Sequence, residues 1–254
     1  MALRCVYTDL DGTLLGAGAS LFRDGEGRFS LLPARALEAC HRSGVEVVCM
    51  SGRRKAQVAE DARLMGQDSY VYEIGGGVVV GGEEHFLCGE FAPVDGRSPH
   101  ELIAASGAPA LLLETYGDRL ATLAPFDRDR YVSHLFRGEV DPEEANALLA
   151  ERGHAGLKLV DNGASHTGGR VFHLIPAQTS KVAGVELHMR ARGYAPGECI
   201  AVGDSAEDLT VAAAVGRFYL VANADVEAVG ANVERTDSGH GEGFYEAVVA
   251  SLMG

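Results

Sequence analysis

Residues 5–13 read Cys5-Val6-Tyr7-Thr8-Asp9-Leu10-Asp11-Gly12-Thr13. The first four side chains form a short apolar run of the kind that favours a strand, so we expect a buried strand that ends at Asp9. Gly12 is typical of a sharp turn directly after such a strand. Two carboxylates separated by one residue, Asp9 and Asp11, can converge on a small site, one as a nucleophile and the other as a proton donor.

Strands and helices alternate on the C-terminal side of this run. Residues 16–30 are polar and contain glycine, which is compatible with either a hairpin or an open loop. Apolar spacing and glycine stops then predict a helix at 32–43, a strand at 45–50, a helix at 54–65, and strands at 70–72 and 78–80. This β-α-β-α-β order indicates a parallel sheet.

The middle of the chain has a less regular pattern. We expect strands at 111–115, 120–123 and 156–160, and a helix at 142–152 that Asp141 caps. The regular alternation resumes with a strand at 170–175, a helix at 179–192, a strand at 199–202, a helix at 206–215 and a strand at 218–221. The prediction is an α/β protein: a Rossmann-like doubly wound parallel sheet core (1–82 and 170–254) with an inserted α+β cap domain (83–169), joined by two hinges.

Composition limits the partners of this chain. Of its 254 residues, 46% are apolar and 23% charged, as in soluble globular proteins. A net charge of -14 repels polyanions, so we expect no nucleic-acid partner. Five scattered cysteines indicate reduced thiols rather than a disulfide framework or a zinc site, and with them a cytoplasmic location. No apolar stretch reaches the length of a membrane span. We expect a monomer or homodimer whose small-molecule ligand, where it is anionic, meets locally concentrated positive charge.

Three further polar clusters follow predicted strand ends, where open parallel sheets bind their ligands. Ser51-Gly52-Arg53 offers an anion a hydroxyl, backbone amides and a guanidinium. Lys181 stands near the start of a helix, whose N-terminal end favours negative charge. The carboxylates of residues 203–208, Gly203-Asp204-Ser205-Ala206-Glu207-Asp208, suit a hard cation with oxygen ligands. Nucleophile, anion clamp, lysine and metal ligands are the parts that phosphoryl transfer requires.

The order of these clusters resembles the four motifs of the haloacid dehalogenase superfamily of phosphatases. The resemblance implies that Asp9 is the nucleophile and Asp11 the general acid and base. Ser51 would donate a hydrogen bond to the phosphate, and Lys181 would neutralise its charge. The Mg²⁺ ligands implied are Asp9, the backbone carbonyl of Asp11, Asp204 and Asp208. The inserted unit between Ser51 and Lys181 resembles the α/β cap of the sugar-phosphatase (Cof/IIB-type) branch.

A second run narrows the resemblance: Gly168-Gly169-Arg170-Val171-Phe172-His173-Leu174 is similar to the Gly-Gly-Arg-Phe-x-His run of mannosyl-3-phosphoglycerate phosphatases. It implies a small phosphorylated sugar or sugar-glycerate as substrate. Three positions depart from the related patterns: Ile74 stands in place of asparagine in Glu73-Ile74-Gly75-Gly76, Lys181 lies in Thr-Ser-Lys-Val, and Glu207 replaces an asparagine. The residues expected to contact substrate are Gly52, Arg53, His134, Arg137, Arg170 and His173.

Two alternatives remain. A phosphomutase would share an aspartyl-phosphate step, but too few residues separate Asp11 from Ser51 for a cap there. A non-catalytic phospholigand sensor could keep the fold without needing so complete a set of groups. The remaining histidines that we considered have no metal-ligand spacing and are interpreted as structural or solvated: His154, His166, His188 and His240.

Overall fold

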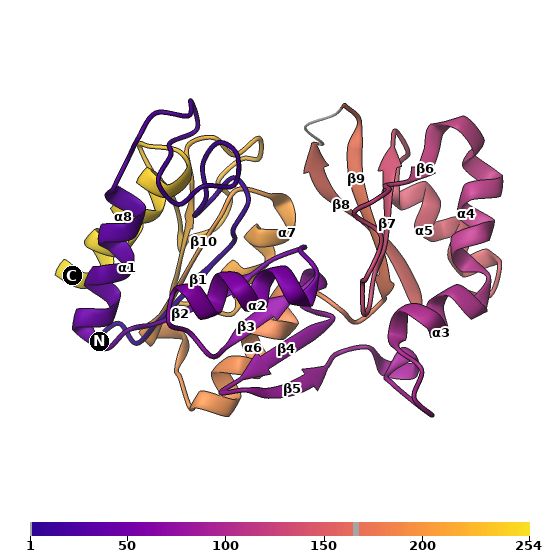
Figure 1. The fold of residues 1–254 in the computed structure, drawn as a ribbon, viewed down its shortest axis with the longest axis horizontal. Coiled ribbons are helices and arrows are strands. Elements are labelled where there is room, and N and C mark those ends of the chain that lie inside the picture. The colour runs from indigo at the N-terminus through magenta and orange to yellow at the C-terminus, as the bar shows by residue number, and fades with distance from the viewer. Residues whose placement is uncertain (1, 165–167) are drawn as a thin grey trace.

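The computed structural model describes residues 2–164 and 168–254, and His166 lies outside them. Within these ranges, an eight-stranded sheet forms the centre of the larger domain (Figure 1). The strand order is β12 (Val233–Arg235), β11 (Arg217–Leu220), β10 (Cys199–Gly203), β1 (Cys5–Thr8), β2 (Glu46–Met50), β3 (Tyr70–Tyr72), β4 (Gly77–Val80) and β5 (Glu83–Phe86). The strands from β12 to β3 run parallel to their neighbours. β4 is antiparallel to both β3 and β5. The predicted doubly wound α/β fold is confirmed.

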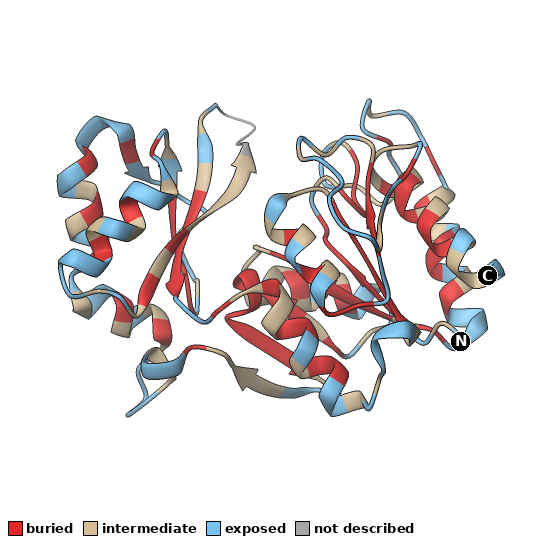
Figure 2. Ribbon diagram, turned by 180° about the vertical axis from the view of Figure 1, so that it is seen from behind, coloured by how far each residue is buried: buried red, intermediate tan, exposed pale blue. Residues whose placement is uncertain are grey.

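Helices cover both faces of this sheet because its side chains alternate between them. Val6 packs on the face covered by α1 (Leu32–Ser43), α2 (Lys55–Leu64) and α8 (His240–Met253). Tyr7 points to the opposite face, which α6 (Lys181–Arg192) covers together with the segment that follows α7 (Ala206–Leu209). Figure 2 shows the buried strands between these layers. The sheet is therefore apolar on both sides, as parallel sheets generally are.

The smaller domain is a four-stranded antiparallel sheet with helices on one face (Figure 1). Its strand order is β6 (Leu120–Thr122), β7 (His134–Gly138), β9 (Arg170–Pro176) and β8 (Leu157–Ala164). Phe136, Phe172 and Leu174 pack with the buried side chains of α3 (Pro99–Ser106), α4 (Ala108–Tyr116) and α5 (Pro142–Glu151). The other face of the sheet is turned toward the larger domain.

The predicted domain boundaries need correction at both hinges. The segment from residue 170, which we expected to rejoin the core, is β9, and it pairs with β7 and β8 in the small sheet. The chain therefore returns to the core after Pro176 rather than at 170. The segment from residue 83, which we placed in the cap, is β5 at the edge of the large sheet.

Among the individual elements, the strand predicted at 111–115 is wrong. These residues lie in α4, because Pro109 opens a helix and the three leucines after it are strong helix formers. Asp141 caps α5 as predicted, with its side chain accepting a hydrogen bond from Glu143 N. Residues 16–30 form a series of turns with two isolated bridges. None of the helices in the described part of the chain is long and apolar enough to cross a membrane.

Candidate active site

The loop that begins at Asp9 follows the carboxyl end of β1, between the ends of its neighbours β10 and β2. Asp9 is buried, and its backbone N–H donates to the carbonyl of Val202 on β10 at 3.0 Å. Gly12 follows with a φ of +87°, and a Cβ atom there would lie 2.3 Å from Asp204 Oδ2. The loop therefore needs glycine at this position, both for its left-handed backbone and for the close approach of Asp204.

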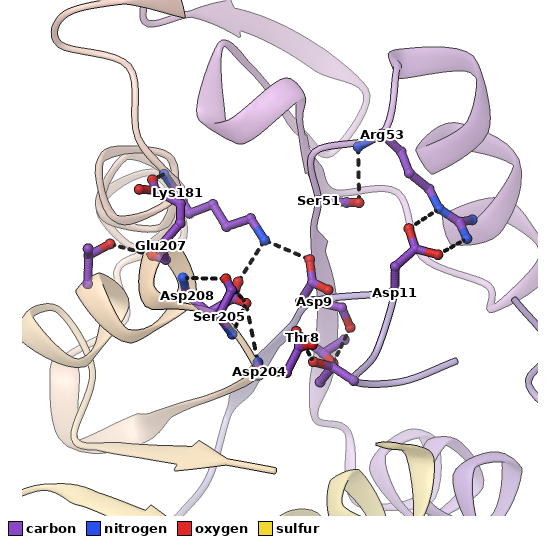
Figure 3. A network of polar contacts seen from close by, with 12 residues as sticks. Thr8, Asp9, Asp11, Ser51, Arg53, Lys181, Asp204, Ser205, Glu207 and Asp208 are labelled. Atoms are coloured by element: carbon purple, nitrogen blue, oxygen red, sulfur yellow. Dashed lines mark hydrogen bonds and ion pairs between the residues drawn. The ribbon is translucent and has the colours of Figure 1, made fainter. Parts of the chain in front are cut away.

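Lys181 connects the two acidic segments of the site (Figure 3). Its Nζ donates to Asp9 Oδ1 and to Asp208 Oδ1, each at 2.6 Å, and the side chain is buried. Burial alone would lower the pKa of this lysine, but the carboxylates of Asp208 and Asp9 outweigh burial and raise it. Lys181 is therefore a fixed positive charge at the centre of the site.

Three carboxylates surround this single ammonium group. Those of Asp9, Asp204 and Asp208 each offer an oxygen within 4.8 Å of the others. Burial and the neighbouring charge of Asp208 raise the pKa of Asp204 to about 7, and burial also raises the pKa of Asp9. These shifts reflect excess negative charge in a desolvated place, which a divalent cation with oxygen ligands would balance. The donor set thus fits Mg²⁺.

Asp208 differs from its two neighbours in how its oxygens are used. Its Oδ2 accepts hydrogen bonds from the backbone N–H and the hydroxyl of Ser205, at 3.1 and 2.6 Å. Its Oδ1 accepts from Lys181. Both oxygens therefore already hold the start of α7 and the lysine, which leaves Asp9 and Asp204 as the better-placed metal ligands.

Ser51 and Arg53 follow β2, the strand next to β1. Thr8 pairs with Cys49 in the sheet, so Asp9 and Ser51 emerge from neighbouring strand ends. Arg53 donates from Nε and Nη2 to the two oxygens of Asp11, at 2.6 and 2.5 Å, and from Nη1 to Asp61 at 2.8 Å. Figure 3 shows the Asp11 carboxylate turned toward this guanidinium, whereas that of Asp9 faces Lys181.

The small sheet reaches the site above Gly52. A Cβ atom on Gly52 would lie 2.9 Å from Asn162 Nδ2 and 3.3 Å from His173 Nε2. Arg130, which lies between the two domains, donates to the Gly52 carbonyl at 3.1 Å and to Ser133 Oγ at 3.0 Å. Gly52 and His173, both of which we expected to contact substrate, are therefore close neighbours where the two domains meet.

Glu73 holds the connection to the small domain. Its buried carboxylate accepts hydrogen bonds from the backbone N–H groups of Tyr131, Val132 and Ser133 at 2.7–3.0 Å. The next residue, Ile74, has a φ of +57°, a conformation in which asparagine is several-fold enriched. This geometry gives a physical reason for the asparagine that the sequence pattern leads one to expect at that position.

Strand alternation separates the four predicted cap residues into two pairs. His173 and Arg137 lie on the face turned toward the core, because they alternate with Phe172 and Phe136, which pack on the helix side. His134 lies on the helix side, where its ring stacks on His100 and its Nε2 contacts the His100 carbonyl at 3.0 Å.

Arg170 is in register with Gly138 on the same side as His134, and it forms an ion pair with Asp161. The face turned toward the core carries further polar side chains that the sequence interpretation missed, Lys158 and Asn162 on β8, with Arg130 beside it. Side chains of a strand alternate between its two faces, so Lys158 and Asn162 could have been identified from the sequence if the length of β8 had been known.

Comparisons with known proteins agree with this architecture. A model of the haloacid dehalogenase-like hydrolase family matches residues 127–248. A phosphoglycolate phosphatase of Halobacterium salinarum is 30% identical over 94% of this chain and 93% of its own length. One from Methanoculleus marisnigri is 27% identical, covering 97% and 95%.

Solved structures show the same fold at lower sequence identity. Thermoplasma acidophilum 0175 aligns over 100% of both chains with a TM-score of 0.71 and 18% identity. The sucrose-phosphatase of Synechocystis aligns over 99% of this chain and 98% of its own, with a TM-score of 0.67 and 16% identity. This chain belongs to the haloacid dehalogenase-like hydrolase family. Within that family it is a phosphatase.

Proposed function

We propose that this protein is a Mg²⁺-dependent phosphomonoester hydrolase in which Asp9 attacks phosphorus. The observation that supports the proposal most strongly is Lys181, buried between Asp9 and Asp208 with Asp204 beside them. Such a lysine can neutralise a phosphate that enters next to the nucleophile. Asp9, Asp204 and the Asp11 carbonyl would hold Mg²⁺, which supplies further neutralisation of the phosphate oxygens.

The reaction proceeds in two displacements. Asp9 attacks the phosphate ester, and Asp11 gives a proton to the leaving oxygen, which produces an aspartyl phosphate and a free alcohol. Asp11 then takes a proton from a water molecule that attacks the phosphorus, which releases phosphate and restores Asp9. Ser51 and Lys181 orient the phosphate in both steps, because this chemistry depends mainly on positioning and charge.

Arg53 controls where the Asp11 carboxylate points. In the arrangement described here Arg53 holds both oxygens of Asp11, so Asp11 must leave this pair before it can reach a leaving group. A phosphate oxygen is a suitable replacement partner, since guanidinium groups bind carboxylate and phosphate in the same bidentate way. Substrate binding would then release the general acid only when a phosphate is present.

The substrate class follows from a feature that two candidates share. Phosphoglycolate, the substrate in the names of the relatives, carries a carboxylate close to its phosphate ester. Mannosyl-3-phosphoglycerate, suggested by the run at residues 168–174, also has one. We therefore assign a small phosphorylated carboxylic acid, with phosphoglycolate as the first candidate.

Lys158 is the cation that we assign to this substrate carboxylate. It lies on the core-facing side of β8, where its positive charge is close enough to favour the ionised form of Glu207. Glu207 in turn accepts a hydrogen bond from Lys181 N. Further along the same face of β8, Asn162 contacts Gly52. β8 therefore extends from the start of α6, which carries Lys181, to the loop that contains Ser51 and Gly52.

The test compares phosphoglycolate with ethyl phosphate, which lacks the carboxylate. Phosphate release should require Mg²⁺ and should be lost in Asp9→Asn for both substrates. Lys158→Gln should lower kcat/KM for phosphoglycolate by roughly 10–100-fold, the value of a hydrogen bond to a charged group, and leave ethyl phosphate unchanged. Equal loss on both substrates would reject Lys158 as the carboxylate contact. Undiminished turnover by Asp9→Asn would reject the mechanism itself.

A further inference from the structure

A second group of metal-ligating side chains lies at the opposite, amino-terminal end of the large sheet. Cys5 on β1 is in register with Glu46 on β2 and with Cys199 on β10. Strand alternation puts Cys5 and Cys199 on the face that α6 covers, and His188 of α6 lies above them. Asp9 is four residues along β1 from Cys5, roughly 13 Å at the rise of a strand.

The donor atoms of three of these residues form a compact set. The ligand atoms of Cys5, Glu46 and His188 all lie within 4.8 Å of one another. Cys5 and His188 are fully buried, and Glu46 is partly buried. Cys199 is the neighbour of Cys5 across the paired strands β1 and β10. Sulfur and imidazole ligands with one carboxylate are characteristic of tetrahedral zinc.

The orientation of His188 is the independent sign of a ligand. Its Nδ1 contacts the Tyr7 hydroxyl at 2.8 Å, whereas its Nε2 has no hydrogen-bond partner among the described residues. Glu46 Oε1 lies 3.4 Å from that Nε2. A ring whose Nδ1–H is held by an oxygen presents the Nε2 lone pair to a metal, which is the usual arrangement of zinc-bound histidine.

Neighbouring groups hold the Glu46 carboxylate in a similar way. Glu46 accepts hydrogen bonds from the Tyr194 hydroxyl at 2.8 Å and from Arg192 Nη2 at 2.9 Å. These contacts orient the carboxylate from outside the cluster, as the outer shell of a metal site does.

We propose that Cys5, Glu46, His188 and Cys199 form a structural zinc site, separate from the Mg²⁺ site of the phosphatase centre. Binding replaces the thiol protons of Cys5 and Cys199, which pass to solvent, and neutralises the two thiolates with the dication. The metal would join β1, β2, β10 and α6 at one end. The same four elements position Asp9, Ser51, Asp204 and Lys181 at the other end.

The test uses Co²⁺ as a spectroscopic substitute for zinc. The full-length protein is freed of metal with a chelator under reducing conditions and titrated with Co²⁺ in excess Mg²⁺. We expect one equivalent to produce a thiolate-to-cobalt charge-transfer band, which carboxylate ligands alone cannot give. The band should be displaced by Zn²⁺, and Zn²⁺ should raise the thermal midpoint.

Variants assign the band to these residues. It should disappear in Cys5→Ser and His188→Gln and persist in Cys40→Ser, a buried cysteine outside any metal-ligand group of the described residues. Tyr7→Phe should weaken cobalt binding by roughly 10–100-fold. If the two ligand variants do not fold, the wild-type titration and Tyr7→Phe still decide. A wild type without the band, or a band unchanged in folded His188→Gln, would overturn the proposal and leave a His188–Glu46 ion pair instead.

Discussion

Substitution of Gly12 by alanine separates the geometry of the active site from ordinary backbone strain. Gly12 has a φ of +87°, and Gly44, at the end of α1, has a φ of +68°. An alanine at either position must adopt a left-handed backbone, which costs about 1–2 kcal/mol. The two sites differ in space: the new Cβ would lie 2.3 Å from Asp204 Oδ2 at Gly12, and at Gly44 nothing lies within 4 Å.

The expected magnitude follows from this contact. Normal van der Waals separation requires the Asp204 carboxylate, or the loop itself, to move by roughly 1 Å, and a displacement of that size near reacting groups costs about 100-fold in rate. Gly12→Ala should therefore lower kcat/KM about 100-fold and weaken the apparent affinity for Mg²⁺. Gly44→Ala should lose only stability.

The assay is Mg²⁺-dependent phosphate release from phosphoglycolate, measured together with chemical denaturation of both variants. Similar unfolding free energies with very different activities would agree with the reasoning. If folded Gly12→Ala is as active as Gly44→Ala, Asp204 does not need the position that the structure gives it.

Three further substitutions test the assignments around the small domain. Burial, with a further contribution from His100, lowers the pKa of His134 to about 4, so neutral His134 stabilises the fold above pH ~6.5. As the pH falls toward ~4, up to about 3 kcal/mol of the free energy of unfolding should be lost, and His134→Gln should reduce that loss. KM should stay unchanged in this variant, and a raised KM would support the predicted contact of His134 with substrate. Glu73→Gln replaces a carboxylate that accepts from several backbone N–H groups by an amide, and should lower the free energy of unfolding by about 1–3 kcal/mol. An unchanged denaturation midpoint would contradict the role of Glu73 in holding the connection to the small domain. Arg170→Gln should leave kcat/KM for phosphoglycolate unchanged, since Arg170 pairs with Asp161 on the helix side; a marked loss would place it at the substrate.

The sequence was sufficient for the parts of the site that follow strand ends. Asp9, Ser51 and Asp204 come directly after buried strands, and parallel strands end at one edge of a sheet, so their meeting follows from the order of the elements. Lys181 could be added because it begins a helix that returns to the same edge.

Features that depend on pairing between distant segments could not be predicted in this way. The strand at β9 has the same local pattern whether it joins the large or the small sheet, and its antiparallel partners decide the matter. The Asp11–Arg53 pair depends on two loop conformations. His188 lacks any ligand spacing in the sequence, because its neighbours Cys5 and Glu46 come from strands more than 140 residues away.

Trapping the phosphoryl group tests the central assignment most directly. Asp11→Asn retains the nucleophile but removes both the general acid of the first step and the base that activates water in the second. Mixed with Mg²⁺ and p-nitrophenyl phosphate, whose leaving group needs no proton, it should therefore accumulate aspartyl phosphate. Intact-protein mass spectrometry should show the addition of one phosphoryl group, and peptide mapping should place it on Asp9. Phosphorylation at another residue, or substrate turnover by a variant that lacks Asp9, would contradict this account.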